Sequence, residues 1–225
     1  MRFFSSYLAS ILDRDLPDVA SVRSVESVAR LLRVVAARSA ALASFHGMGS
    51  ELEVDAGTVR NHAKILEDLF LIRRLNPWHA NLGARHVKTA KLHVVDSGLL
   101  AFLIGANEQR IASDGAVAGM LLESFVAMEL LRQSDWLDEP VALYHYRDKQ
   151  QREVDIVIER YSGEIAGVEV KASATVTGGD FAALRYLRDK LGPLFRGGVV
   201  LYLGARTLPF GERLAAVPLS GLWTA

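Results

Sequence analysis

The chain has 225 residues, of which 50% are hydrophobic and 23% are charged, with 26 basic and 26 acidic side chains. This balance is typical of a folded chain and excludes an intrinsically disordered one. The absence of cysteine excludes disulfides and thiolate zinc sites. Because the net charge is zero, any binding of nucleic acid must come from a local patch.

Length and hydropathy give the expected organisation. No apolar run approaches the roughly 20 residues that a membrane-spanning helix needs, and the start MRFFSSYLAS has no signal-peptide apolar region. We therefore expect a soluble, cytoplasmic protein. The polar stretch 105–115 is the best candidate for a linker, which divides the chain into domains 1–110 and 111–225.

The first half has a helical pattern. Apolar residues recur at three-to-four residue spacing from Val25 to Ala36, which predicts a helix with one buried face. The glycine-rich segment 46–49 predicts a break, after which Ser50 is the candidate cap of a short helix. Asp55 is the candidate cap of a second helix. The residues that this second helix is expected to bury are Val59, Ala63, Leu66 and Phe70.

Two helices joined by a tight turn and followed by extended segments at 71–75 and 91–95 predict a winged helix. One interpretation is DNA binding, with helix residues in a groove and wing residues near phosphates. The helix residues are Thr58, Arg60, Asn61 and Lys64, and the wing residues are Arg85, Lys88 and Lys91. The alternative is a module for packing or protein interaction. Five histidines of this half, namely His46, His62, His79, His86 and His93, match no metal motif and are expected at the surface or in loops.

The second half changes to a mixed pattern. An apolar helix is predicted over 116–133, and strands rich in Val, Ile and Tyr are predicted over 141–146, 154–158, 166–171 and 199–203. Asp180 is the candidate cap of a helix that runs to Leu191, with Gly192 as its stop. The order helix, three strands, helix, strand predicts a mixed sheet with helices on its faces.

The candidate chemistry lies in the hairpin EVDIVIERYSGEIAGVEVKAS. If Ser162 is the midpoint of its turn, Asp155 lies opposite Glu169 and Glu153 lies opposite Lys171, and all four share one face of the sheet. Two acids directly opposed destabilise a strand pair unless a cation lies between them, and Mg²⁺ suits carboxylate oxygens. Lys171 would then orient the attacking water or stabilise phosphate charge. The alternative is that Glu-x-Lys is a solvated face, with Glu153 and Lys171 as an ordinary ion pair.

Two further residues belong to this hypothesis. Glu123 lies in the apolar helix GMLLESFVAMELL, where a carboxylate needs a metal, an arginine or a hydrogen-bond donor, unless it is a helix former at an edge. Arg147 precedes the hairpin and is expected either to bind phosphate with two hydrogen bonds or to pair with Glu123.

The set Glu123, Asp155, Glu169 and Lys171 resembles the PD-(D/E)xK nuclease superfamily, with Val154 where the name-giving proline stands. The resemblance implies Mg²⁺ or Mn²⁺ held by Asp155, Glu169, the Val170 carbonyl and Glu123, with Lys171 as catalytic base or electrostatic partner. The expected fold is an all-helical winged-helix domain followed by a mixed-sheet, restriction-endonuclease-like α/β domain.

The whole chain also resembles the C-terminal region of bacterial and archaeal AAA-type ATPases. The segments that carry this resemblance include YLASILDRDLP, TVRNHAKILEDLFLIRRLNPW, KLHVVDSGLLAFLIG, LLESFVAMELLR and GVEVKAS. In that group an ATPase lies upstream, but this chain has no G-x-x-x-x-G-K phosphate loop, so we expect no ATPase activity from it. The expected partners are DNA and an AAA-type ATPase domain, in a longer chain or separate. Two functions stay open: a Mg²⁺-dependent DNA endonuclease, and a non-catalytic DNA-binding or docking module that regulates the ATPase.

Overall fold

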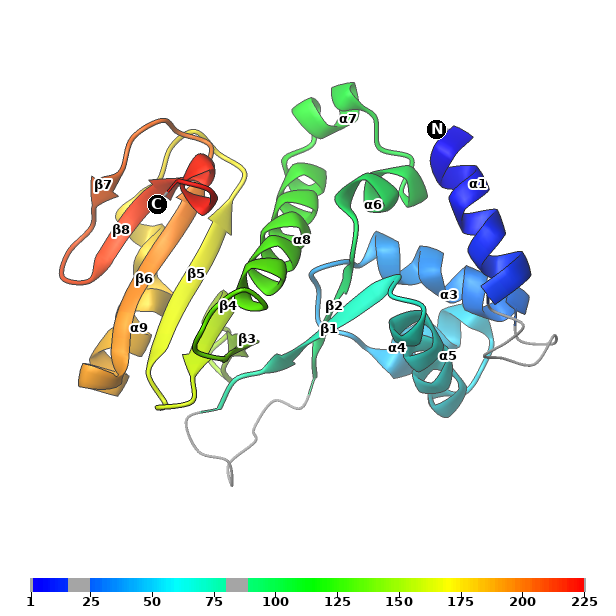
Figure 1. Cartoon of the computed structure of the whole chain (residues 1–225), viewed down its shortest axis with the longest axis horizontal. Helices are drawn as coiled ribbons and strands as arrows, with labels where there is room; N and C mark the ends of the chain where they lie inside the picture. Colours follow the sequence, from blue (N-terminus) through cyan, green and yellow to red (C-terminus); the bar gives the residue numbers. More distant parts are fainter. Residues whose placement is uncertain (1, 16–24, 80–88, 225) are drawn as a thin grey trace. The chain divides into compact units, whose positions relative to one another are not determined.

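The computed structural model describes residues 2–15, 25–79 and 89–224 (Figure 1). By the density of its internal contacts the chain divides into two units. The first comprises Met1–Arg74 and Thr89–Phe125, and the second comprises Leu75–Lys88 and Val126–Ala225. Within the described residues, no helix is long and apolar enough to cross a membrane.

The first unit is mainly helical. Its elements are α1 (Arg2–Ser10), a π-helical turn (Ile11–Asp15), α3 (Val25–Ala37), α4 (Phe45–Leu52), α5 (Ala56–Asp68), the start of β1 (Ile72–Pro77), β2 (Lys91–Val94), α6 (Ser97–Leu103), α7 (Glu108–Ser113) and the first part of α8 (Gly115–Ser134). The periodicity that predicts α3 is confirmed, because Val28, Leu31, Leu32 and Val35 are buried in the core of this unit. The segment expected to be a linker contains α7.

The glycine-rich segment is not a break. Gly47 and Gly49 lie inside α4, whose cap is Ser44 and not Ser50; the Ser44 hydroxyl accepts a hydrogen bond from the Gly47 N–H at 3.1 Å. A Cβ atom on Gly49 would lie 2.6 Å from the Val54 carbonyl oxygen. Gly49 therefore allows α4 to pack closely against the turn that follows it. The glycine serves this packing and does not end the helix.

The predicted cap of α5 is confirmed. Asp55 Oδ1 accepts hydrogen bonds from the N–H groups of Gly57 and Thr58 at 2.7 and 3.0 Å, and Val59, Ala63 and Leu66 are buried. Phe70 is not buried with them, because α5 ends at Asp68 and Phe70 adopts a φ of 55° with 75% of its surface exposed. The short helix, turn and longer helix are thus present, with β2 next to β1 in strand order, while the winged-helix assignment stays a prediction.

The second unit is built on a mixed sheet. Its strands follow the order β1-β3-β4-β5-β6-β8-β7. They are β3 (Val141–Arg147), β4 (Glu153–Arg160), β5 (Ile165–Lys171), β6 (Phe195–Tyr202), β7 (Leu208–Pro209) and β8 (Leu214–Pro218). Strands β3, β4 and β5 are antiparallel, and β5 and β6 are parallel. The predicted order helix, three strands, helix, strand is confirmed; β7 and β8 were not predicted.

Helix α9 (Ala182–Leu191) covers one face of this sheet (Figure 1). A Cβ atom on Gly167 would lie 2.5 Å from Leu184 Cδ2, so the glycine in β5 permits close packing of the helix. Asp180 is not the cap of α9. It forms a reciprocal capping box with Thr177 around a short 3₁₀ turn (Gly178–Phe181). The predicted stop at Gly192, with a φ of 56°, is confirmed.

Candidate functional site

The hairpin of β4 and β5 has the predicted register. Ile156 pairs with Val168, Val157 with Gly167, and Ile158 with Ala166, as a turn centred on Ser162 requires. The backbone pairs end at Ile156 and Val168, so Asp155 and Glu169 each lie one residue beyond the last pair. The direct opposition of these two acids across the strand pair stays a prediction.

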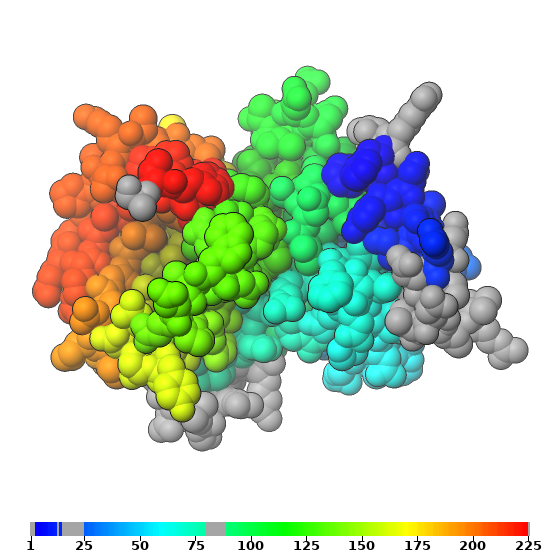
Figure 2. Space-filling model, viewed as in Figure 1, coloured from blue at the N-terminus to red at the C-terminus, as the bar shows by residue number. Residues whose placement is uncertain are grey.

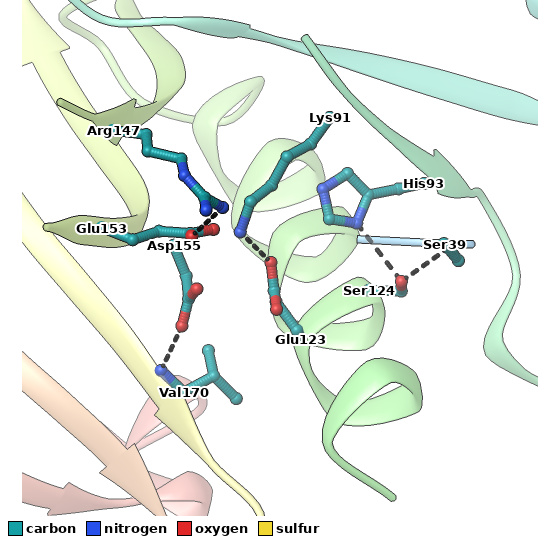
Figure 3. Close-up of polar contacts among 9 residues, drawn as sticks. All are labelled: Ser39, Lys91, His93, Glu123, Ser124, Arg147, Glu153, Asp155 and Val170. Carbon is teal, nitrogen blue, oxygen red and sulfur yellow. Dashed lines mark hydrogen bonds and ion pairs between the residues drawn. The ribbon is translucent and has the colours of Figure 1, made fainter. Parts of the chain in front are cut away.

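Beyond the last backbone pair, the side chain of Asp155 links β4 to β5. The N–H of Val170 donates a hydrogen bond to Asp155 Oδ2 at 3.0 Å (Figure 3). The carbonyl of a strand residue points to the same side as its N–H, so the Val170 carbonyl also faces β4. The Asp155 carboxylate is thereby held beside the run Glu169-Val170-Lys171.

A bulge in β4 corrects one expectation. Tyr144 and Tyr146 of β3 pair with Val157 and Val154, so β4 has one extra residue between them. Val154 and Val157 accordingly contact the same buried cluster, although residues three apart in a regular strand face opposite sides. Glu153 therefore does not share the face of Glu169 and Lys171.

Arg147 takes Glu153 as its partner. Its Nη1 donates to Glu153 Oε2 at 2.8 Å, and its Nη2 donates to Gln151 Oε1 (Figure 3). Both ionic side chains are about 30% exposed. Arg147 therefore bonds to two residues of its own unit, and its predicted role at a phosphate stays a prediction.

Glu169 and Lys171 differ in their surroundings. Glu169 is 7% exposed, whereas the Lys171 side chain is 39% exposed. The Lys171 ammonium lies 3.8 Å from Asp180 Oδ1, and not against Glu153. The candidate catalytic cation is therefore accessible and has a carboxylate partner from the loop after β5.

The loop after β5 positions Asp180. Its Oδ2 accepts hydrogen bonds from the Thr177 N–H at 2.7 Å and from the Thr177 hydroxyl at 3.0 Å. These bonds, the backbone one first, lower the pKa of Asp180 below its ordinary value, and the charge of Lys171 contributes. Sequence reasoning missed this residue as part of the site, although Thr177-x-x-Asp180 is a capping-box spacing.

Glu123 belongs to the first unit and has a lysine partner there. Its Oε1 accepts from Lys91 Nζ at 2.6 Å, and the Lys91 side chain is only 2% exposed (Figure 3). The expectation that this carboxylate needs a partner is confirmed. The expectation that Lys91 lies on a wing near phosphates is wrong, because an ammonium this deeply buried cannot reach a phosphate backbone.

The same unit contains a buried chain of polar groups. The hydroxyls of Ser39 and Ser124 lie 2.9 Å apart, His93 Nδ1 lies 3.2 Å from Ser124 Oγ, and the Val94 N–H donates to Ser39 at 3.1 Å. His62 and His93 are buried, so the expectation of surface histidines is wrong for both. Burial lowers the pKa of His62.

The expected groove-facing residues of α5 form two groups. Arg60, Asn61 and Lys64 are exposed, with the Arg60 guanidinium 5.7 Å from the centre of the Phe45 ring and Lys64 paired with Asp68. Thr58 instead donates its hydroxyl to Asp55 Oδ2 at 2.5 Å. Contact with nucleic acid stays a prediction for all four, and Arg85 and Lys88 lie outside the described residues.

Metal binding rests on few donors. Among the described residues, no group of three or more histidine or carboxylate side chains is close enough to hold a metal ion. The second unit offers Asp155, Glu169 and the Val170 carbonyl. Mg²⁺ is commonly bound through one or two carboxylates and keeps several waters, so this donor set fits Mg²⁺ or Mn²⁺ better than zinc, which takes three or four protein ligands.

Comparison with known proteins gives two family matches. Residues 1–110 match a domain of unknown function (DUF8612), and residues 118–222 match a second domain of unknown function (DUF4143). The second domain is commonly found with AAA-type ATPases. The first match ends at residue 110, where the sequence predicts the domain division, and the second begins at residue 118. The boundaries of the two compact units differ from this, because the chain passes from one unit to the other after Arg74 and again after Phe125.

Two curated relatives match nearly the whole chain. They are an uncharacterized protein of Mycobacterium bovis and one of Mycobacterium tuberculosis, each 28% identical over 219 residues, which is 97% of this chain and 47% of the relative. The chain therefore spans about half the length of the curated relatives it matches. No solved structure matches the chain.

Proposed function

We propose that the second unit carries a metal-dependent site for cleavage of phosphodiester bonds in DNA, of the PD-(D/E)xK type. The hydrogen bond from the Val170 N–H to Asp155 Oδ2 carries this proposal, because it joins the hairpin acid to the Glu-x-Lys strand. A solvated Glu-x-Lys face would expose its glutamate, whereas Glu169 is only 7% exposed.

The arrangement of the elements supports the resemblance. The C-terminal part of α8, the antiparallel strands β3, β4 and β5, the crossover through α9, and the parallel strand β6 follow the order that the nuclease resemblance implies. The site residues lie where β4 leaves its backbone pairing with β5. A fold alone does not establish an activity, so the proposal depends on the side chains.

In the proposed site Asp155 and Glu169 would hold Mg²⁺ with the help of the Val170 carbonyl. A bound ion of this kind would activate a water and stabilise charge on the phosphate. Lys171 contributes a cation at the scissile phosphate. Asp180 keeps the Lys171 ammonium near the loop after β5, where it stays accessible to a bound phosphate. Glu123 as a further ligand stays part of the prediction made from the sequence.

The partners follow from both units. Arg60, Asn61 and Lys64 on the exposed surface of α5 are the proposed DNA contacts of the first unit. An AAA-type ATPase domain, in a longer chain or separate, is the proposed protein partner, and the common occurrence of the second domain with such ATPases supports it.

Cleavage tests this proposal directly. The purified protein is incubated with plasmid DNA and Mg²⁺ or Mn²⁺ beside Lys171→Ala and the control Lys149→Ala, which removes an exposed loop lysine. We expect the rate to fall by about a hundredfold or more in Lys171→Ala only, as is usual when a group that stabilises transition-state charge is lost. Equal cleavage by the wild type and Lys171→Ala would remove the catalytic claim.

A non-catalytic DNA-binding or docking module is the second candidate. Two ion pairs favour it, because they give Glu123 and Lys171, two residues of the predicted catalytic set, partners within the protein. Glu123 pairs with Lys91, and Lys171 pairs with Asp180. Calorimetry with Mn²⁺ separates the candidates, because heat that disappears in Asp155→Asn and Glu169→Gln supports the metal site. DNA binding that falls with salt, without such heat and without cleavage, supports the module.

A further inference from the structure

The second unit has an open hollow on the sheet face opposite α9. Its volume is about 760 Å³. The C-terminal half of α8 and Leu222 form one wall, with Leu130 and Gln133 from the helix. The Gln133 side chain donates to the Leu222 carbonyl at 2.9 Å, which fixes this wall. In Figure 2 the red C-terminal residues lie against green α8.

The floor of the hollow is apolar and made partly of small residues. Ala166 of β5 pairs with Gly197 of β6, and Val199 of β6 pairs with Ala215 of β8. A Cβ atom on Gly197 would have its nearest neighbour 3.7 Å away, so the floor is open above this glycine. The other face has no such space, since a Cβ on Gly167 would meet Leu184.

The charges of the lining are basic. Arg196 and Arg213 line the hollow, and among its described lining residues none is acidic. Arg196 Nη1 lies 3.5 Å from Glu164 Oε1, and Arg213 donates to the carbonyls of Gly192 and Phe195 at 2.8 and 2.5 Å and lies 3.4 Å from Glu212. Exposed pairs at these distances are weak, so an incoming carboxylate can compete for Arg196.

An apolar projection lies beside this hollow. Directly after α8, Trp136 is 83% exposed and Leu137 is 54% exposed. The acidic residues Asp135, Asp138 and Glu139 flank them and are exposed as well. Leu137 lines a second hollow of about 460 Å³, which shares Ile158, Ala166 and Arg196 with the first. The projection and the hollow therefore form one continuous surface.

We propose that this surface joins two copies of the chain, with residues 135–139 of each copy seated in the hollow of the other. A twofold contact requires that one patch carry both complementary parts, and here the acidic, aromatic projection adjoins a basic, apolar hollow. Exposed tryptophan beside arginine is typical of the residues that dominate binding energy at interfaces. The contact does not depend on the proposed nuclease function.

The oligomeric state tests the proposal. Sedimentation equilibrium of the full chain is expected to show a dimer, and Trp136→Ser is expected to weaken association by about thirtyfold or more, the loss expected when an interface anchor is removed. Gly197→Phe should do the same by filling the hollow from its floor. Phe70→Ser is the matched control, because Phe70 is a 75% exposed aromatic residue of the first unit, whereas the proposed contact is built from the second.

A mixing experiment sharpens the test. Trp136→Ser keeps an intact hollow and Gly197→Phe keeps an intact projection, so one of the two seats is intact in the mixed pair and none in either homodimer. The two variants are therefore expected to associate with each other more tightly than either associates with itself. A wild-type chain that stays monomeric at all concentrations would overturn the proposal, even if another protein occupies the hollow. A dimer that both substitutions leave unchanged would overturn it as well.

Discussion

In the first unit the carboxylate of Glu123 is bonded at 2.6 Å to the buried ammonium of Lys91, whereas in the second unit the buried Glu169 precedes Val170, whose N–H binds the carboxylate of another acid, Asp155. Opposite charges at close range stabilise each other where water is excluded. Two adjacent acids raise the free energy of the folded state unless a cation joins them. The first arrangement is an ion pair, and the second is the site that we propose to bind a metal ion.

The lysines differ in the same way. Lys91 is 2% exposed, and the Lys171 side chain is 39% exposed and lies 3.8 Å from its carboxylate partner. A buried pair is costly to break, because the remaining charge stays in a medium of low polarity. An exposed pair at this distance contributes little to stability. Loss of Lys91 should therefore affect folding, and loss of Lys171 should affect function.

The largest expected effect is at Lys91. Lys91→Ala is expected to lower the free energy of unfolding by about 3–5 kcal/mol, the usual result when one partner of a buried ion pair is removed. Urea denaturation followed by circular dichroism measures this. Lys64→Ala is the control, since Lys64 pairs with Asp68 on the exposed surface of α5 and its loss should cost under ~1 kcal/mol.

Replacing both members of the pair distinguishes charge from packing. Lys91→Met combined with Glu123→Leu should recover most of the stability, because an apolar pair of similar size often replaces a buried ion pair without loss. If Lys91→Ala cost no more than Lys64→Ala, the distinction between the two units would not hold.

The sequence was sufficient where local patterns determine the structure. The spacing of Val28, Leu31 and Leu32 predicted α3, and Asp55 predicted the start of α5. The turn around Ser162 predicted the register of β4 and β5. Each depends on residues close in the chain, for which burial period and capping are reliable signals.

The sequence was insufficient where contacts between distant segments decide. Either face of the strand could be the apolar one in the segment Val154-Asp155-Ile156-Val157. The bulge that decides this depends on the pairing of β4 with Tyr144 and Tyr146 of β3, which the segment itself does not reveal. An apolar helix around Glu123 predicted that the acid has a partner, but nothing in the helix identifies Lys91, 32 residues away. The same holds for Asp180, whose nearness to Lys171 depends on the loop between them.

Asp155 has a structural role, as the acceptor of the Val170 N–H, and a proposed role in metal binding. Its variants can therefore separate a structural carboxylate from a binding one. Asp155→Ala leaves the Val170 N–H without its carboxylate acceptor, which is expected to cost about 1–3 kcal/mol. Asp155→Asn keeps an oxygen acceptor and should cost under ~1 kcal/mol. Thermal unfolding gives the stabilities, and Mn²⁺ calorimetry is expected to show weakened binding in both. Full Mn²⁺ binding by Asp155→Asn would assign the carboxylate to structure alone.

The smallest effect is expected at Asp180 and depends on pH. Its pKa is lowered in the folded state by the Thr177 hydrogen bonds, so its stabilising contribution is present above the unfolded value of about 3.9 and is lost as pH falls through the folded value. At pH 6 Asp180→Asn should therefore be less stable than the wild type by about 1 kcal/mol or less. Thermal unfolding measured from pH 6 to pH 3 should show this difference shrink below pH ~4.

Thr177→Val provides the comparison, since it removes the hydroxyl bond and keeps the carboxylate beside Lys171. If Asp180 only caps the turn, both substitutions should reduce stability and leave cleavage unchanged. If Asp180 also holds Lys171 for the proposed reaction, Asp180→Asn should lower the cleavage rate more than Thr177→Val does at equal loss of stability. A pH-independent difference between Asp180→Asn and the wild type would show that the charge of Asp180 contributes nothing, and the loop would then be a structural cap like that of α5.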